Sequence, residues 1–105
     1  MTNRGGCGDD AGRVPRRSTP TWEEFARELG HNLRRARAAK GLSQQRVANM
    51  AGLTGFTYQK YEKGESRPGQ PANPQLRSLV ALSQVLDVPL VELLPSTFPD
   101  ATGGR

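Results

Sequence analysis

A small residue, a glycine and a tyrosine at fixed spacing constrain this chain more than any other feature. Ala48 is followed four residues later by Gly52, and Tyr58 follows six residues after that. This spacing suits two short helices that meet at a steep angle through a turn of about three or four residues. Ala48 lets the second helix approach closely, and Gly52 supplies the positive φ that a residue with a Cβ resists. The pattern therefore predicts an angular pair of helices at the centre of the fold.

A longer helix is predicted before this pair. Thr21 and Glu24 form a T-x-x-E capping box directly after Pro20, so the helix should begin at Thr21. Gly41 is placed to end it in a left-handed conformation. Apolar residues recur at helical spacing on one stripe between these ends: Trp22, Phe25, Ala26, Leu29, Leu33 and Ala36.

The two helices of the central pair are also bounded by capping residues. Ser43 is a natural N-cap for a helix over about 44–51, and Thr54 for a helix over about 55–62. Gly64 is placed to close the second of them. The angular pair is thus a helix-turn-helix pattern, which favours duplex DNA as the partner.

A loop and two further helices complete the predicted fold. Residues 65–72 hold two prolines and a glycine, so we expect no regular structure there. Asn73 is expected to cap a fourth helix with Pro74 in its first turn, and a short fifth helix is expected between Pro89 and Pro95. The fourth helix should bury Leu76, Leu79, Val80, Ser83 and Leu86, with Leu82 beside them. Five helices without a strand signal predict an all-α domain.

The length and composition limit the chain to one small domain with tails. We expect a disordered basic leader over 1–20, a helical domain over 21–95 and a disordered tail over 96–105, because both ends hold few apolar residues to bury, Phe98 being the exception in the tail. Neither a membrane-spanning run nor a secretory signal is present, so a cytoplasmic protein is predicted.

Charge and reactive side chains narrow the function further. The net charge of +5 favours a polyanionic partner without identifying one. The single cysteine, Cys7, and the single histidine, His31, cannot form an internal disulfide or a metal site by themselves. No paired carboxylates, nucleophile elbow or phosphate-binding glycine loop appears, so we predict neither an enzyme nor a bound cofactor.

Several short motifs together resemble the Cro/phage-repressor-like helix-turn-helix family, also called the xenobiotic-response-element type. They are the L-S-Q of Leu42–Gln44, the A-x-x-x-G-L-T of Ala48–Thr54 and the Y-E-K-G of Tyr61–Gly64, followed by the apolar segment Leu76–Leu94. The resemblance covers roughly residues 30–94. It implies a five-helix, lambda-repressor-like DNA-binding domain, and members of this family mostly bind operator DNA as dimers.

The chain departs from the family pattern at four places. Tyr58 stands where a β-branched residue is usual, and the loop over 65–72 is longer than the usual family loop. Asp87 replaces a common glycine. Gly55 and Phe56 stand where recognition helices often carry polar residues.

The resemblance implies that the helix over about 55–62 is a recognition helix in the major groove. The residues carried over as base or groove contacts are Gln44, Gly55, Phe56, Gln59 and Lys60. Glutamine can pair with adenine, a phenylalanine ring can pack on a thymine methyl, and lysine can reach guanine acceptors. The residues carried over as phosphate contacts are Ser43, Thr54, Thr57, Arg46, Lys63 and Arg67.

Other interpretations of these residues stay open. Gln44, Lys60 and Lys63 could be ordinary solvated side chains, and Arg46 and Arg67 could be surface charges without a ligand. Phe56 could be buried under the long loop or belong to a protein interface. The leucines of the fifth helix could form a dimer surface or could complete the monomer core; they are Leu90, Leu93 and Leu94.

The predicted function is sequence-specific binding of double-stranded DNA by a bacterial or phage-type transcriptional regulator, a repressor or autoregulator. We expect a homodimer on a DNA operator in the nucleoid, with no membrane partner and no small-molecule ligand domain. The alternative is a protein-interaction module, such as an antitoxin or adaptor subunit, that uses the same fold.

Overall fold

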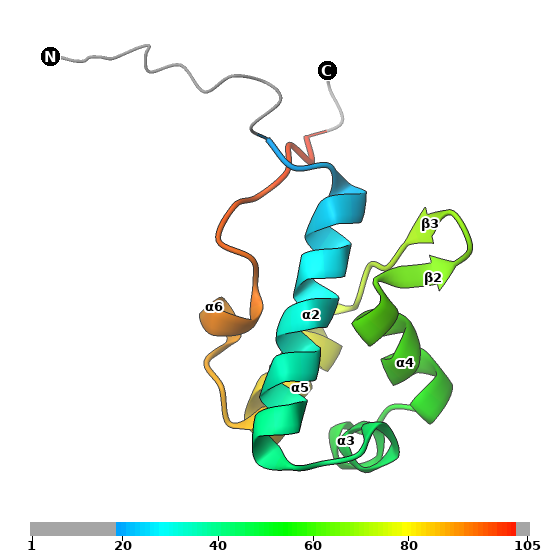
Figure 1. Ribbon diagram of the computed structural model, residues 1–105, viewed down its shortest axis with the longest axis vertical. Helices are drawn as coiled ribbons and strands as arrows, with labels where there is room; N and C mark the ends of the chain where they lie inside the picture. The colour runs from blue at the N-terminus through cyan, green and yellow to red at the C-terminus, as the bar shows by residue number, and fades with distance from the viewer. Residues whose placement is uncertain (1–18, 103–105) are drawn as a thin grey trace, which may run out of the picture.

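The computed structural model describes residues 19–102. Residues 1–18 of the predicted leader, Cys7 among them, and residues 103–105 of the predicted tail lie outside the described residues. The described part contains, in order, α2 (Trp22–Lys40), α3 (Gln44–Ala51), α4 (Gly55–Lys63), β2 (Glu65–Arg67), β3 (Gln70–Pro71), α5 (Leu76–Leu86) and α6 (Leu90–Leu93). Helix α2 runs through the middle of the molecule, with α3 and α4 on one side and α6 on the other (Figure 1). This arrangement confirms the predicted helical class.

The first three helices begin and end where the capping residues predict. The Thr21 hydroxyl accepts from the Glu24 amide at 3.1 Å, and the Glu24 carboxylate accepts from the Thr21 amide at 2.9 Å, which completes the capping box. Ser43 and Thr54 cap α3 and α4 in the same way. The closing glycines are all left-handed, as a C-terminal cap requires: Gly41, Gly52 and Gly64 have φ of 71°, 75° and 82°.

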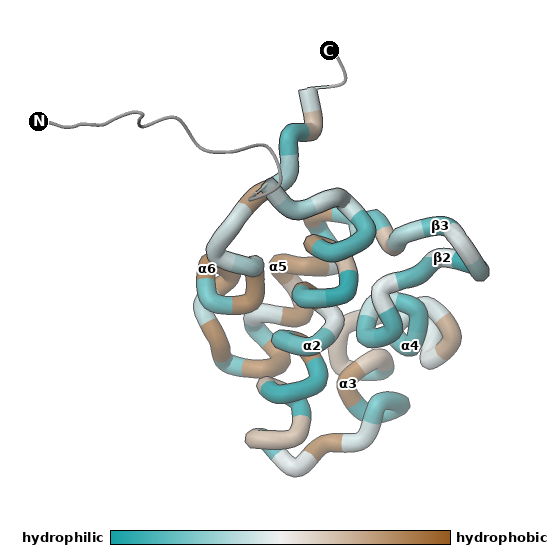
Figure 2. Tube along the Cα trace, turned by 45° about the horizontal axis from the view of Figure 1, so that its top comes forward, coloured by the Kyte–Doolittle hydropathy of each residue, from teal (hydrophilic) through white to brown (hydrophobic). Residues whose placement is uncertain are grey.

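The core lies where α2, α3, α4, α5 and α6 converge. Its fully buried large side chains are Tyr58, Leu33, Leu82, Leu86, Leu93 and Val47. Figure 2 shows apolar residues gathered on α5 and α6, whereas the strands are mostly hydrophilic. Asp87, which stands where the family commonly has glycine, ends α5 with φ of 57°. Aspartate is among the few non-glycine residues that tolerate this left-handed conformation.

The prediction that residues 65–72 have no regular structure is wrong. Strands β2 and β3 pair antiparallel, with Glu65 opposite Pro71 and Arg67 opposite Gln70. Proline followed by glycine suits the two central positions of a type II turn, and Gly69 has the positive φ of 81° that such a turn requires. The proline and glycine that indicated a loop therefore form the tip of a hairpin.

The predicted start of the fourth helix is also wrong. Helix α5 begins at Leu76 after Gln75, which makes no side-chain cap. Gln75 has extended backbone angles, φ −68° and ψ 145°, so a helix cannot run through it from Pro74. The predicted inner face was wrong at Leu76 and Val80, which are exposed. The buried positions of α5 instead follow a stripe at helical spacing: Ser78, Leu79, Leu82 and Leu86.

The segment after α6 contacts the start of α2. The centroids of the Phe98 and Phe25 rings are 5.4 Å apart, and those of the Phe25 and Trp22 rings are 5.2 Å apart. The segment over residues 96–102 contains neither helix nor strand. Among the described helices, none combines the length and apolar character that a membrane crossing would need.

Candidate nucleic-acid interface

Helix α4 turns one side to the core and the other to solvent. Tyr58 and Glu62 are buried, whereas Phe56, Gln59 and Lys63 are exposed. This is the orientation that the sequence predicts for the helix. Phe56 is 69% exposed, which excludes the interpretation that the hairpin segment buries it.

Lys60 and Phe56 interact on the outward side of α4. The Lys60 ammonium lies 4.3 Å from the centroid of the Phe56 ring. An ammonium at this distance over an aromatic face is attracted by the ring quadrupole. The exposed ring therefore holds the lysine head over the first turns of the helix instead of leaving it free to move in solvent.

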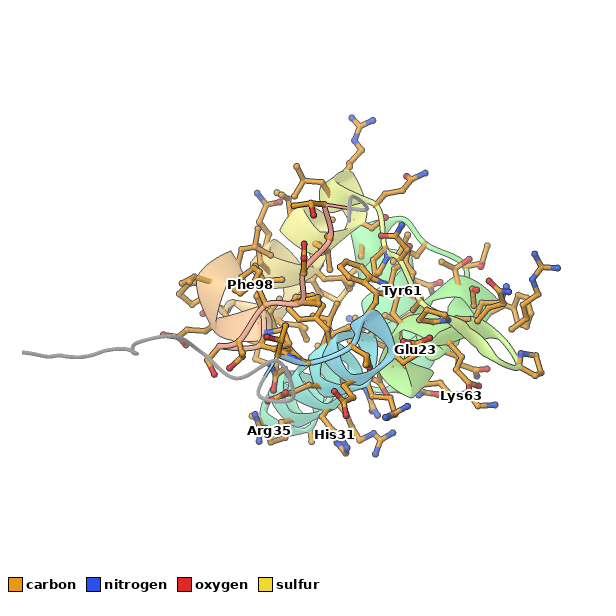
Figure 3. The ribbon with its side chains drawn as sticks, turned by 90° about the horizontal axis from the view of Figure 1, so that it is seen from above. Glu23, His31, Arg35, Tyr61, Lys63 and Phe98 are labelled. Atoms are coloured by element: carbon orange, nitrogen blue, oxygen red, sulfur yellow. The ribbon has the colours of Figure 1, made fainter. Side chains whose placement is uncertain are left out.

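A groove lies between the outward side of α4 and the hairpin. It encloses about 600 Å³ and is lined by Phe56, Gln59, Lys60, Lys63, Glu65, Ser66, Arg67 and Pro68. Three of these side chains are cationic and one is anionic. Figure 3 shows Lys63 on this side of the molecule, away from His31 and Arg35 on α2. The groove therefore combines the helix predicted to read bases with the segment that had been expected to be an irregular loop.

The predicted phosphate-contacting hydroxyls lie at the N-termini of α3 and α4. The Ser43 hydroxyl accepts from the Arg46 amide at 3.0 Å. The Thr54 hydroxyl accepts from the Thr57 amide at 3.0 Å and donates to the Thr57 hydroxyl at 2.9 Å. Thr54 is thus engaged within the cap, whereas the hydrogen atoms of the Ser43 and Thr57 hydroxyls stay available to an anion.

Gln44 is placed differently from the other predicted groove contacts. Its amide Nε2 donates to Glu62 Oε1 at 2.9 Å, and its side chain is half-buried. A buried carboxylate needs hydrogen-bond donors, and Gln44 supplies one of them. Its amide is therefore oriented by the interior of the protein. Gly55, at the start of α4, lies against the Gln45 side chain, which in turn donates to Asn49 at 2.9 Å.

Glu62 is the centre of a buried polar network on the inner side of α4. Its side chain is 2% exposed, and Arg37 of α2 donates to it twice, from Nε at 2.6 Å and from Nη2 at 3.2 Å. Arg37 Nη1 also donates to the Leu42 carbonyl at 2.9 Å. These bonds join α2, the start of α3 and the end of α4. The network therefore holds the C-terminal end of α4 against α2 and the start of α3.

The network shifts the ionisation of its members. Burial alone would raise the pKa of Glu62, but the hydrogen bonds from Arg37 and Gln44 outweigh it and hold that pKa below its ordinary value. The hydrogen bond to Glu62 raises the pKa of Arg37. Burial raises the pKa of Tyr58, and the neighbouring Glu62 carboxylate adds to the rise. The Tyr58 hydroxyl is buried and forms no hydrogen bond with the described part of the chain.

Two glycines set the distance between α2 and α4. A Cβ on Gly30 would collide with the backbone carbonyl of Glu62, and a Cβ on Gly64 would lie 2.9 Å from the Cα of Arg27. Sequence analysis missed Gly30, Arg37 and Glu62 as positioning residues. A glycine in the middle of an otherwise regular amphipathic helix was the available signal, because it is unfavourable there unless another backbone approaches.

The leucines of the predicted dimer surface do not share one environment. Leu93 is 1% exposed and belongs to the core, so it has no surface to offer a second copy. Leu90 and Leu94 pack partly against the same core. Val91, which was not predicted, is 76% exposed. The interpretation that these leucines complete the monomer core is therefore correct for Leu93.

No group of three or more histidine, cysteine, aspartate or glutamate side chains that could hold a metal ion occurs within residues 19–102. The remaining hollow of note lies on the exposed side of α2, encloses about 400 Å³, and is lined by Glu24, Arg27, Glu28, His31, Asn32 and Arg35. Its charges are mixed, and Arg35 already donates to Asn32 at 2.7 Å.

Comparison with known proteins places the chain in a family. A family model described as a helix-turn-helix domain matches residues 28–94. The crystal structure of the restriction-modification controller protein C.AhdI from Aeromonas hydrophila matches with 33% sequence identity and a TM-score of 0.57, covering 66% of this chain and 96% of that one. None of the curated proteins matches significantly. The predicted resemblance to Cro-like helix-turn-helix proteins is confirmed, and the chain belongs to the helix-turn-helix domain family.

Proposed function

We propose that this chain is a DNA-binding transcription regulator that places α4 in the major groove of a specific double-stranded operator. The observation that carries the proposal is the outward side of α4, where the exposed Gln59 amide and Phe56 ring lie beside the half-buried Lys60, whose ammonium is over that ring. The likeness to a protein named as a restriction-modification controller supports a regulatory role, repression or autoregulation, rather than an enzymatic one. Its place of action would be the nucleoid.

The residues on α4 suit different parts of the DNA. Gln59 and Lys60 offer donors to base edges, and the Phe56 ring offers an apolar surface to a thymine methyl. Gly55 has no side chain, and the Gln45 side chain occupies the space of the missing Cβ, so a contact from Gly55 to DNA would come from its backbone. Gln44 would act behind this face, because its amide donor is engaged by Glu62. The helix N-terminus also presents unpaired N–H groups to an anion.

The proposed phosphate contacts surround this face. Cations and hydroxyls that contact phosphates fix the register of a protein on the duplex without reading its sequence. Of the predicted set, five keep a free donor toward solvent: Ser43, Arg46, Thr57, Lys63 and Arg67. Thr54 would contribute through the cap it makes for α4, rather than by donating to a phosphate.

Selection of bound sequences from random duplex DNA, using the full chain, tests the proposal. A single enriched motif is expected. Lys60→Ala should then weaken binding to that motif by about 1–3 kcal/mol and relax its sequence at one position. Lys63→Ala is the matched control, because it removes the same charge from the same helix and should weaken all DNA sequences equally. Failure to enrich any motif, together with no measurable binding to nonspecific duplex, would refute the proposed function.

We also propose that the chain binds its operator as a homodimer. A single small module gains affinity when two copies bind half-sites about one DNA turn apart. The partly buried Leu90 and Leu94 flank the exposed Val91 and leave an apolar edge on α6 that a second copy could cover. Sedimentation of the chain with and without operator DNA tests this extension. A monomer under both conditions would refute it.

A protein-interaction module, such as an antitoxin or adaptor subunit, is the second candidate. The exposed Phe56 ring favours it, because aromatic residues are enriched in protein–protein interfaces relative to the rest of the surface. If a protein partner remained bound after Lys60 and Lys63 were both changed to alanine while DNA binding was lost, the two roles would be separable.

A further inference from the structure

We propose that the β2–β3 hairpin is a second DNA-contacting element, which holds one sugar–phosphate strand in the groove between itself and α4. The proposal rests on the proposed function, because it assumes that α4 enters the major groove. It adds a structural element, the hairpin, and a specific ligand, the sugar–phosphate backbone of one DNA strand at the edge of the major groove.

The dimensions of DNA and of a helix determine what the hairpin would meet. An α-helix with its side chains measures about 10–12 Å across, and the major groove of B-form DNA is about 12 Å wide. A helix placed in it leaves no room for a second element beside the base edges. Anything that lies alongside α4 on the same side of the protein must therefore face one of the two bordering backbones. The hairpin occupies this position, since it shares a groove with the outward side of α4.

The charges in the groove match a phosphate strand. Lys63 lines it from α4, beside the Lys60 assigned to a base edge, and Arg67 lines it from the hairpin, so cations approach from both walls. Glu65 is the single acidic residue among the lining side chains. Glu65 is the first residue of β2 and is half-buried, so it lies at the base of the hairpin. The negative charge is thus at the base of the hairpin, whereas Lys63 and Arg67 are exposed.

The base of the hairpin is fixed to the body of the protein. The Ala72 amide donates to the Gly64 carbonyl at 2.9 Å, and the Trp22 indole N–H donates to the Ala72 carbonyl at 3.0 Å. Gly64 itself lies against the backbone of Arg27. Both ends of the hairpin are therefore anchored beside α2.

The tip is free by contrast. All four residues from Arg67 to Gln70 are exposed. A rigid base with an exposed cationic tip can contact a strand without a large ordering cost, because only the tip side chains lose freedom on binding. Figure 1 shows the hairpin projecting from the body beyond the end of α4.

Arg67→Ala in the full chain tests the proposal, with the selected operator as the probe. Each lost phosphate contact makes the slope of log K against log salt less steep by about 0.9. The affinity lost in the variant should therefore be about eightfold greater at about 0.1 M salt than at about 1 M salt. Hydroxyl-radical footprinting of the same complex should show lost protection on one strand beside the major groove, with the sequence preference unchanged. Arg67→Glu should give a larger loss at the same nucleotides.

Arg35→Ala is the matched control, because it removes an exposed arginine from α2, on a side of the molecule away from Lys63 (Figure 3). It should leave the salt slope and the footprint unchanged. An unchanged slope and footprint for Arg67→Ala would overturn the role of the hairpin even though specific binding persists. Equal losses for Arg67→Ala and Arg35→Ala would also overturn it, since they would indicate a general charge effect. If the unmodified chain bound no DNA, the proposed function would fail first, so the two failures are distinguishable.

Discussion

Replacing the buried carboxylate of Glu62 with an amide should destabilise the fold more than any surface change of equal size. Glu62→Gln keeps the shape of the side chain and removes its charge. The side chain is 2% exposed and accepts two hydrogen bonds from Arg37 and one from Gln44. The glutamine would present an amide N–H₂ to donors in place of one carboxylate oxygen. At least one of the three bonds must therefore be lost.

The structure limits the size of the effect. Breaking a fully buried ion pair costs about 3–5 kcal/mol, because the remaining charge is left without a partner. Arg37 is less isolated than this, since its side chain is 18% exposed and Nη1 keeps its bond to the Leu42 carbonyl. We therefore expect Glu62→Gln to lower the free energy of unfolding by about 2–3 kcal/mol. The free energy of unfolding of small domains is about 5–15 kcal/mol in total, so this loss would be a large fraction of the stability.

Urea unfolding of the purified chain, followed by circular dichroism, measures the change. Arg34→Ala is the control, because Arg34 approaches the same carboxylate only at 3.9 Å and its side chain is 55% exposed. Such an exposed pair contributes about 0–1 kcal/mol. A loss below about 1 kcal/mol in Glu62→Gln, or one no larger than that of Arg34→Ala, would refute the claim that this network stabilises α4.

The ion pair between Glu62 and Arg37 should make the stability of the protein depend on pH. The pKa of Glu62 is lower in the folded chain than in the unfolded chain, so its stabilisation is present above the unfolded value of about 4.3. It is lost as the pH falls below that value and through the folded pKa. The stability difference between the unmodified chain and Glu62→Gln should thus be constant near neutral pH and shrink in acid. A difference that stayed constant down to the acid unfolding of the protein would contradict this account.

Two other substitutions probe the same region. Tyr58→Phe should leave the stability unchanged or raise it by up to about 1 kcal/mol, because it removes a buried hydroxyl with no well-formed hydrogen bond; a clear loss in urea unfolding would show that the hydroxyl contributes. Gly30→Ala should lose about 1–3 kcal/mol although alanine normally favours a helix interior, because its methyl group would collide with the Glu62 carbonyl. A more stable Gly30→Ala chain in thermal unfolding would show that α2 and α4 separate easily.

The helices that bear the site could be predicted because their end signals are local. Thr21 with Glu24, Ser43 and Thr54 each bond a backbone amide three residues away, so nothing distant decides where these helices begin. The hairpin could not be predicted in this way. Its strands are three and two residues long, too short to show an alternating pattern. The residue that follows them, Ala72, is held by Trp22, which is 50 positions away in the sequence.

The residues on the outward side of α4 could be predicted from the sequence, but the polar contacts on its inner side could not. The outward positions of α4 follow from helical spacing once Tyr58 is assigned to the core. The engagement of Gln44 does not follow, because its partner Glu62 is 18 residues away and is itself buried. Nor does the exposure of Leu76 and Val80, because α5 buries a stripe that begins at the polar Ser78 and continues through Leu82, so apolar spacing alone did not identify it.

The bond between the Trp22 indole and the Ala72 carbonyl also has a practical consequence. Trp22 is the only tryptophan in the sequence, and its N–H contacts the residue at which the hairpin joins the helical body. The tryptophan fluorescence of the unlabelled protein, excited selectively over tyrosine, therefore reports on one location. A titration that shifts the emission spectrum would detect strain transmitted to that joint, and a bound ligand that leaves the joint undisturbed would leave the spectrum as it is.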